Sequence, residues 1–202
     1  MADYAGLILA GGAGYFLGSI PFGLIVGRRL GNVDVRNYGS GNIGTTNVLR
    51  VLGPAPAAVV LGFDLGKGAL SALLGSRLAG SWGASIAAAM AVVGHSFPVW
   101  LGFRGGKSVA TAAGGLLVLA PKVLLIEIAL FVAVVATTRY VSLGSILAAA
   151  AVPFLFAATG SDTPGIAYAA VAGGLVIVRH RTNIRRLLSG TENRLGKKAG
   201  PG

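Results

Sequence analysis

Long apolar runs separated by short polar segments are the feature of this sequence that most restricts its fold. The first run covers about residues 4–26 and the second about residues 54–74. About 20 apolar residues in a helix cross the hydrocarbon core of a bilayer, where the backbone must satisfy its own hydrogen bonds. Charged residues make up only 11% of the 202 residues, whereas a soluble domain has about 25%. The sequence therefore predicts an all-α integral membrane protein.

Five further apolar runs bring the expected total to about seven transmembrane helices. They cover about residues 81–100, 109–120, 123–137, 142–158 and 166–178. The run at 109–120 is short for a full crossing, so we expect it to be tilted or extended into the preceding loop. The first run lacks the basic segment that begins a signal peptide, so we expect it to be retained.

Lysine and arginine positions predict the orientation, because cytoplasmic loops of membrane proteins are enriched in both. With the N-terminus outside, the outer segments hold little beyond Arg77 and Lys122. The sequence thus predicts an outside N-terminus, a cytoplasmic C-terminus, one membrane-embedded domain over residues 1–202 and a basic cytoplasmic tail over residues 181–202. The inner segments then contain Arg28, Arg29, Arg36, Arg50, Arg104, Lys107, Arg139, Arg179, Arg181, Arg185, Arg186, Arg194, Lys197 and Lys198.

The scarcity of some residue types excludes several kinds of chemistry. Cysteine is absent, which excludes disulfides and thiolates, and the two histidines are too few for a zinc-type cluster. Asp34 and Glu192 are the only acids in the expected inner loops, which argues against a two-carboxylate hydrolase or a carboxylate-bound metal. We therefore expect no metal and no cofactor. The net charge of +11 would suit a nucleic-acid binder, but the apolar spans exclude a soluble one.

The polar segment at 31–53 is dense in Gly, Ser, Thr and Asn, and Arg50 lies near its end. Glycines let the backbone approach a ligand closely, and exposed N–H groups and short hydroxyls can bind an anion. The segment contains no Walker A sequence. A flexible connector would explain the glycines but not the concentration of Asn42, Thr45, Thr46 and Asn47. We therefore predict a substrate-binding loop.

A second candidate anion site is the stretch Arg104–Ser108. Its paired glycines free backbone donors, and a helix beginning near Ser108 would point its positive end at a phosphate. Anchoring by positive charge at the inner membrane face would explain Arg104 and Lys107. It would not explain the paired glycines followed by Ser108 and Thr111, so we predict a phosphate site.

Histidine and asparagine residues add to these loops at the inner ends of the helices. His95 lies near the inner end of the third run, where it could be either structural or an acid–base group. His180 and Asn183 are three residues apart, so on a helix they share a face. Binding of the basic tail to anionic lipid would explain its arginines but not His180 and Asn183.

Three charged residues lie within the apolar runs, where charges are costly and usually paired or functional. Asp64 and Lys67 have the i, i+3 spacing of an ion pair within one helix. We interpret them as structural, or as supporting the site indirectly. Glu127, in the fifth run, is left without a role.

Five segments of the sequence closely resemble the bacterial membrane glycerol-3-phosphate acyltransferases that use acyl phosphate as donor. They match in order from about residue 18 to residue 183. The other class of glycerolipid acyltransferase carries HxxxxD, but here Trp100 and Arg185 stand at that spacing from the two histidines. The matching segments are GSIPFG (Gly18–Gly23), NYGSGNIGTTNVLR (Asn37–Arg50), FDLGKG (Phe63–Gly68), GHSFPVWLGFRGGKSVAT (Gly94–Thr111) and YVSLGSI (Tyr140–Ile146).

The resemblance implies a seven-helix enzyme of the bacterial inner membrane with its active site at the cytoplasmic face. Such an enzyme transfers an acyl chain from acyl phosphate to the 1-hydroxyl of glycerol 3-phosphate, and an enzyme that forms acyl phosphate would act upstream. By motif match, the residues that line the site are Ser40, Asn42, Arg50, Lys107, Ser145, His180 and Asn183. With the loops above, the predicted catalytic residues are Lys107, His180, Asn183, Ser145 and Arg50. The predicted substrate-binding residues are Ser40, Gly41, Asn42, Thr45, Thr46, Asn47, His95, Arg104, Gly105, Gly106, Ser108 and Ser142.

Because acyl phosphate is already activated, the glycerol hydroxyl can attack it without a covalent enzyme intermediate. His180 is one candidate for the general base, and the resemblance implies a substrate phosphate as the other. The rival interpretation is a transporter for an anionic phosphate compound. Transporters tend to place charges at the midplane and to contain internal repeats, whereas this chain gathers its basic residues on one expected face.

Overall fold

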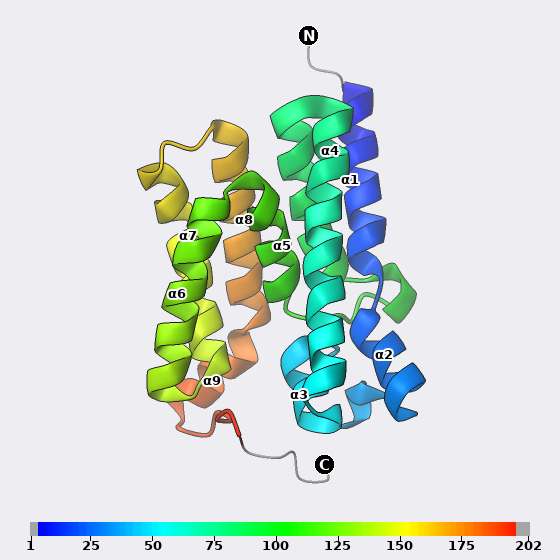
Figure 1. Ribbon diagram of the computed structural model, residues 1–202, viewed down its shortest axis with the longest axis vertical. Helices are drawn as coiled ribbons and strands as arrows, with labels where there is room; N and C mark the ends of the chain where they lie inside the picture. Colours follow the sequence, from blue (N-terminus) through cyan, green and yellow to red (C-terminus); the bar gives the residue numbers. More distant parts are fainter. Residues whose placement is uncertain (1–3, 197–202) are drawn as a thin grey trace.

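The computed structural model describes residues 4–196, and the regular elements of this part of the chain are all helices (Figure 1). The α-helices lie side by side as a bundle, with the N-terminus at one end and the C-terminus at the other. The elements are α1 (Tyr4–Ser19), α2 (Phe22–Gly31), η1 (Val35–Asn37), α3 (Thr45–Leu52), α4 (Pro54–Ser96), η2 (Val99–Leu101), α5 (Val109–Leu119), α6 (Pro121–Thr138), α7 (Val141–Ala158), α8 (Thr163–Arg179) and α9 (Arg181–Leu188), where η denotes a 3-10 helix.

The first apolar run is interrupted, although the sequence predicts one helix over about residues 4–26. Helix α1 ends at Ser19 and α2 begins at Phe22. Pro21 causes the break, because proline has no N–H and its ring clashes with the preceding helical turn. The carbonyl of Ile20 is thereby freed from regular helix bonding, and it accepts a hydrogen bond from Lys67 Nζ at 3.0 Å.

Helix α4 consists of two antiparallel arms, as the second and third apolar runs predict. The chain reverses at Ala79 and Gly80, where the backbone is not helical and Gly80 has φ 58°. Helix α1 packs mainly against α4. A side chain at Gly14 would meet the backbone of Ala87, so glycine is needed for this close approach. Small residues serve this purpose in membrane bundles, where lipid provides no hydrophobic drive for association.

The remaining helices complete the bundle around an apolar core between α4, α5, α7 and α8. Phe156 and Tyr168 are the largest side chains in this core. Helix α5 has only 11 residues, which confirms that this run is short. The stretches Tyr4–Gly31, Pro54–Leu101, Pro121–Thr138 and Val141–Ala158 are long and apolar enough to cross a membrane, and α5 and α8 are shorter apolar helices.

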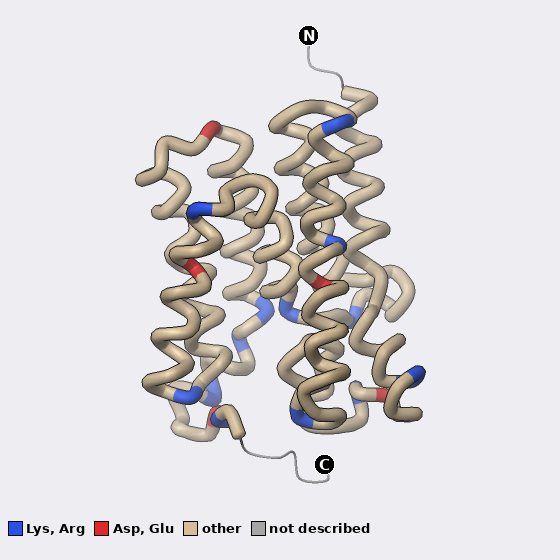
Figure 2. Tube along the Cα trace, viewed as in Figure 1, with Lys and Arg blue, Asp and Glu red and all other residues tan. Residues whose placement is uncertain are grey.

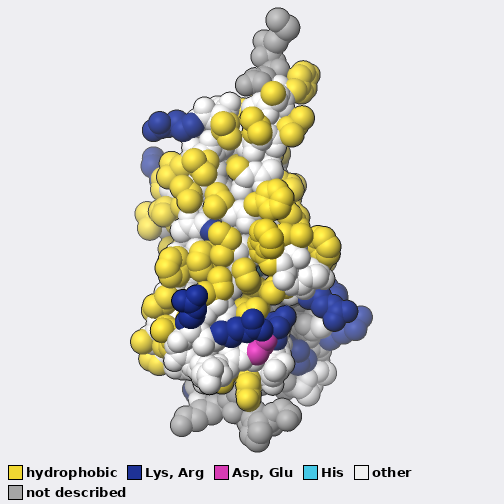
Figure 3. All heavy atoms as spheres, turned by 90° about the vertical axis from the view of Figure 1, so that its right-hand side faces the viewer, with side chains coloured by type: hydrophobic (Ala, Val, Ile, Leu, Met, Phe, Trp, Pro, Cys, Tyr) yellow, Lys and Arg dark blue, Asp and Glu magenta, His cyan; other side chains and the backbone are white. Residues whose placement is uncertain are grey.

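Charged and apolar side chains occupy different parts of the surface. Lysine and arginine gather toward the end of the bundle that holds the C-terminus (Figure 2). Large apolar side chains cover much of the rest of the face in Figure 3. Leu125 of α6 and Phe154 of α7 are examples of exposed apolar residues. Such a surface suits lipid around the bundle and water at its basic end.

Two predicted features need a more detailed description. The polar segment at 31–53 is not simply a loop, because it contains η1 and helix α3, and α3 carries Thr45, Thr46, Asn47 and Arg50. The predicted basic tail begins with helix α9, whereas its Lys197 and Lys198 lie outside the described residues.

Candidate functional site

A connected network of polar side chains lies at the basic end of the bundle, where α7, α9 and the segment before α5 meet. Lys107 Nζ donates to Asn183 Oδ1 at 2.6 Å, and Asn183 Nδ2 donates to Glu192 Oε1 at 2.7 Å. The same Glu192 oxygen accepts from Ser142 Oγ at 2.9 Å, and Arg186 Nε donates to Glu192 Oε2 at 2.7 Å. The network joins three residues that are distant in the sequence but were predicted together: Lys107, Ser142 and Asn183.

Lys107 is a cation in an environment that disfavours its charge. Burial, together with the nearby Arg186 and Arg50, lowers the pKa of the Lys107 ammonium to about 8, although Glu192 opposes the shift. Burial likewise lowers the pKa of Arg50, while the charge of Glu192 opposes it. Because one carboxylate faces several cations, the site has a surplus of positive charge that an anion can neutralise.

Glu192 remains an anion in this setting. Burial alone would raise the pKa of its carboxyl, but hydrogen bonds from Asn183, Arg186 and Ser142 outweigh burial and lower it. The carboxylate therefore orients Asn183 and Ser142 by accepting from both. An acidic residue is unusual in this basic C-terminal segment. Its presence is a signal in the sequence from which a role for Glu192 could have been predicted.

His180 lies between α8 and α9 and is buried. Its Nδ1 is 2.8 Å from the carbonyl oxygen of Val176. A carbonyl can only accept, so Nδ1 carries the hydrogen and Nε2 keeps its lone pair. Burial and the charge of Lys107 lower the pKa of His180 to about 4. The imidazole is therefore neutral near pH 7 and offers a hydrogen-bond acceptor.

Ser145 is buried on α7, one turn after Ser142, and its hydroxyl donates to the carbonyl of Val141 at 2.9 Å. The Ser145 oxygen can still accept a second hydrogen bond, because a hydroxyl oxygen has two lone pairs.

In the predicted loop at Ser40–Arg50, Asn47 holds the chain in place. Its Nδ2 donates to the carbonyls of Val35 and Asn42 at 2.8 Å each, and its Oδ1 accepts from the backbone N–H of Ser40 at 2.8 Å. Asn42 in turn accepts from the backbone N–H of Gly44 at 2.8 Å. The amides of Asn42 and Asn47 are thus used within the loop. The other predicted residues of this segment differ in exposure. Ser40 and Gly41 are exposed, whereas Thr45 and Thr46 are partly buried. Within the described part of the chain, the Thr45 hydroxyl has no hydrogen-bond partner.

The predicted phosphate segment at Arg104–Ser108 is held from two sides. Arg179 donates to the carbonyls of Gly105 and Gly106 at 2.8 and 2.9 Å. Ser108 points away from Lys107, since its hydroxyl donates to Val92 O at 2.8 Å and lies 2.6 Å from Ser96 Oγ. This role of Arg179 was not predicted from the sequence.

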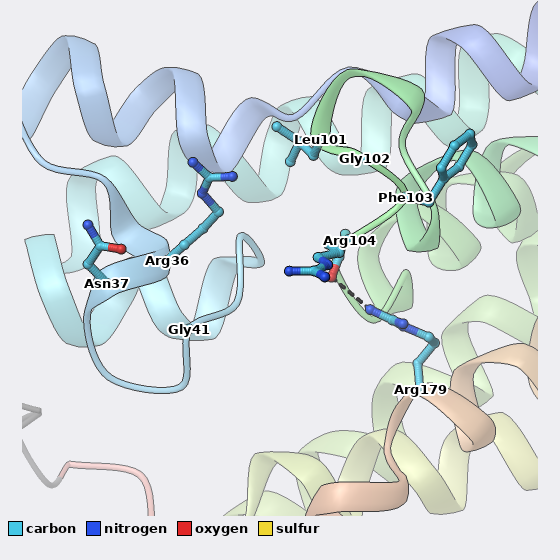
Figure 4. Close-up of a pocket in the computed structure, with 9 residues that line it drawn as sticks. Arg36, Asn37, Gly41, Leu101, Gly102, Phe103, Arg104 and Arg179 are labelled. Atoms are coloured by element: carbon cyan, nitrogen blue, oxygen red, sulfur yellow. Dashed lines mark hydrogen bonds between the residues drawn. The ribbon is translucent and has the colours of Figure 1, made fainter.

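Arg104 lies apart from the Lys107 network and lines a cavity of about 720 Å³ together with Arg36, Gly41 and Arg179 (Figure 4). In this view the guanidinium groups of Arg36 and Arg104 both extend into the space between η1 and the Gly102–Gly105 segment. Arg36 is also paired with Asp34, at 2.6 Å.

The ionisable residues inside the apolar part of the bundle form a separate cluster. Lys67 Nζ lies 2.8 Å from Asp64 Oδ1, which confirms the ion pair expected from their spacing. His95 joins them, with Nδ1 2.7 Å from Lys67 Nζ. Among residues 4–196, His, Asp and Glu side chains form no group of three or more that could hold a metal ion.

Comparison with known proteins gives one consistent result. Residues 8–190 match a family described as glycerol-3-phosphate acyltransferase. A protein with that name from Synechococcus sp. (strain JA-3-3Ab) is 48% identical to this chain, over 98% of the chain and 98% of its own length. One from Symbiobacterium thermophilum is 51% identical, over 93% of the chain and 94% of its own length.

Two solved structures resemble the whole bundle. Both are described as PlsY, an integral membrane glycerol 3-phosphate acyltransferase, one in a glycerol 3-phosphate form and one in a lysophosphatidic acid form. The first superposes with a TM-score of 0.89 at 39% identity, covering 94% of this chain and 96% of that one. The second gives 0.87 at 38% identity, covering 94% and 95%.

Proposed function

This chain belongs to the glycerol-3-phosphate acyltransferase family of multi-pass integral membrane enzymes, and we propose that its acyl donor is acyl phosphate. The acyl chain passes to the 1-hydroxyl of glycerol 3-phosphate, and lysophosphatidic acid and inorganic phosphate are the products. The observation that carries this proposal is the half-buried ammonium of Lys107, held by Asn183 among further cations. A site with surplus positive charge suits a reaction in which both substrates carry phosphate.

The proposed reaction needs no covalent enzyme intermediate. The glycerol oxygen bonds to the acyl carbon, and the bond from that carbon to the phosphate oxygen breaks with its electron pair leaving on phosphate. Lys107 and Arg50 stabilise the phosphate charge and the tetrahedral oxyanion. Asn183 and Ser145 orient the glycerol 3-phosphate, and alignment of two bound substrates supplies much of the remaining rate enhancement.

The proton of the attacking hydroxyl goes to a substrate phosphate rather than to His180. Burial and Lys107 lower the pKa of His180 to about 4, while the second pKa of a phosphate monoester is about 6. The phosphate is therefore the stronger base near pH 7. His180 Nε2, with its free lone pair, accepts a hydrogen bond from the 2-hydroxyl of glycerol 3-phosphate and so aligns the 1-hydroxyl with the acyl carbon.

The arrangement of the helices supports a topology with the active site at the cytoplasmic face of the bacterial inner membrane. We propose seven crossings, made by both arms of α4 together with α1, α5, α6, α7 and α8. The basic end of the bundle then faces the cytoplasm by the positive-inside rule, with the N-terminus outside. We propose a single membrane-embedded domain with a basic cytoplasmic tail, supplied by an upstream enzyme that makes acyl phosphate.

The test uses purified protein in detergent with acyl phosphate and glycerol 3-phosphate. We expect inorganic phosphate to appear in a one-to-one ratio with lysophosphatidic acid, and only when both substrates are present. Flux of glycerol 3-phosphate into sealed vesicles without phosphate release in detergent would instead indicate a transporter. Turnover with an acyl thioester but not with acyl phosphate would refute the proposed donor.

A further inference from the structure

The cluster of Asp64, Lys67 and His95 lies outside the network described above and is almost completely buried, with each residue at most 4% exposed. Asp64 and Lys67 lie on the first arm of α4 and His95 on the second. Lys67 Nζ forms an ion pair with Asp64 Oδ1 at 2.8 Å and lies 2.7 Å from His95 Nδ1 and 3.0 Å from the Ile20 carbonyl oxygen. One ammonium thus joins both arms of α4 to the break between α1 and α2.

The hydrogen-bond pattern determines which nitrogen of His95 carries the hydrogen. A lysine ammonium has three donors and no acceptor, and the carboxylate of Asp64 favours the ammonium form. Nδ1 of His95 must therefore accept from Lys67, and the hydrogen of the neutral imidazole lies on Nε2. Asp64 Oδ1 is farther from Nδ1, at 3.5 Å, so Lys67 makes the closer contact.

The His95 ring lies directly against the segment that presents Lys107. A side-chain carbon at Gly106 would collide with Nε2, Cδ2 and Cε1 of His95. The backbone N–H of Gly106 donates to the His95 carbonyl at 2.9 Å, and that of Gly105 donates to the Ser96 carbonyl at 3.2 Å. Arg179 holds the carbonyls of Gly105 and Gly106. The two glycines are thus fixed between His95 and Arg179.

Stability alone does not account for this cluster. Replacing a buried ion pair by apolar residues of similar volume is often neutral or stabilising, because burying two charges offsets most of their attraction. In this chain the pair orients an imidazole that lies against Gly106, and Lys107 follows immediately. Positioning of Lys107 therefore accounts for the buried pair.

We propose that Asp64 and Lys67 are positioning residues, which fix His95 in its Nε2–H tautomer so that its ring holds Gly106 and sets the position of Lys107. This inference rests on the proposed function in one respect, namely that Lys107 binds a substrate phosphate. Displacing a catalytic group by about 1 Å can reduce the rate 10²-fold. We therefore expect loss of this orientation to lower kcat/KM by about 10- to 100-fold.

The first test removes both charges together in the double variant Asp64→Asn, Lys67→Met, which leaves no unpaired buried charge. We expect kcat/KM for both substrates to fall by about 10- to 100-fold while the thermal midpoint stays near that of the parent. The matched control is Ser71→Ala, since Ser71 is buried one turn further along the same arm and its hydroxyl donates to the Lys67 carbonyl. Parental kcat/KM in the double variant would overturn the inference.

The second test reads the tautomer without using activity. The chain has two histidines, so ¹⁵N-histidine labelling gives two imidazole ring patterns. We expect one ring with hydrogen on Nδ1, which is His180, and one with hydrogen on Nε2, which is His95. The Nε2–H pattern should be lost in the Asp64→Asn, Lys67→Met variant. Finding it unchanged there would overturn the inference.

A further variant decides the matter if the double variant does not fold. His95→Asn keeps an acceptor for Lys67 but removes the ring from Gly106. We expect the parental thermal midpoint with about 10- to 100-fold lower kcat/KM, and parental kcat/KM would overturn the inference. If the parent chain itself showed no acyl transfer, the proposed function would fail, whereas the tautomer measurement would still test the orientation of His95.

Discussion

Replacing Lys107 with alanine should separate activity from stability. In the folded protein the pKa of Lys107 falls from 10.5 to about 8. At about 1.4 kcal/mol per pKa unit, the fold disfavours the charged form relative to the neutral form by about 3 kcal/mol. Two unit charges 4 Å apart attract by about 4 kcal/mol near a protein surface. A bound phosphate therefore offsets the cost, and we expect Lys107→Ala to lower kcat/KM by about 10²- to 10³-fold.

The same variant should not destabilise the fold. Removing a disfavoured, half-buried charge offsets the loss of the hydrogen bond to Asn183, so we expect a thermal midpoint equal to or above that of the parent. The assay is phosphate release in detergent, with a thermal melt of the same sample. Lys122→Ala is the matched control, because Lys122 is an exposed lysine in the first turn of α6. Activity of Lys107→Ala within tenfold of the parent, with Lys122→Ala unaffected, would refute the reasoning.

Three further predictions concern the same network. The value of kcat/KM should decrease as pH rises through about 8, because Lys107 loses its charge there, and this decrease should be absent in an active Lys107→Arg variant. Its persistence in that variant would assign the titration to another group. Glu192→Ala should lower the thermal midpoint and activity together, because it leaves Asn183 and Ser142 without their acceptor. Glu192→Gln should retain more of both. Equal losses for the two variants, in a thermal melt and in the activity assay, would contradict this. His180→Gln should reduce kcat by about tenfold in the same assay, because His180 orients the substrate and does not take its proton. A general base contributes about 10²- to 10⁴-fold, so a loss beyond 10³-fold would show that His180 takes the proton.

The helices could be predicted from the sequence because the hydrocarbon core of a membrane imposes a minimum length on apolar runs. The two arms of α4 and the short α5 follow from this rule. The break at Pro21 was missed because the apolar pattern continues across it. Hydropathy does not reflect that proline lacks the backbone N–H a continuous helix requires. Helix α3 was missed because Gly, Asn and Thr dominate the segment before it, and its helical conformation depends on packing against α4.

The positions of the loops that carry the network were predictable, but the partners within it were not. The spacing of Lys107 from Asn183 in the sequence does not reveal that they are 2.6 Å apart. Glu192 was noticed as a rare acid, yet its three hydrogen bonds depend on the fold that returns the chain to α7. His95 joins Lys67 because the chain reverses at Gly80, and no local pattern indicates that contact.

The most direct test of the central claim is a crystal structure of this chain with glycerol 3-phosphate and a non-hydrolysable acyl-phosphate analogue bound. We predict an oxygen of the analogue's phosphate group within about 3 Å of Lys107 Nζ, the distance of a charge-assisted hydrogen bond, with Asn183 and Ser145 facing the glycerol hydroxyls. The phosphate group of the analogue bound instead between Arg36 and Arg104, with Lys107 contacting only Asn183, would contradict it.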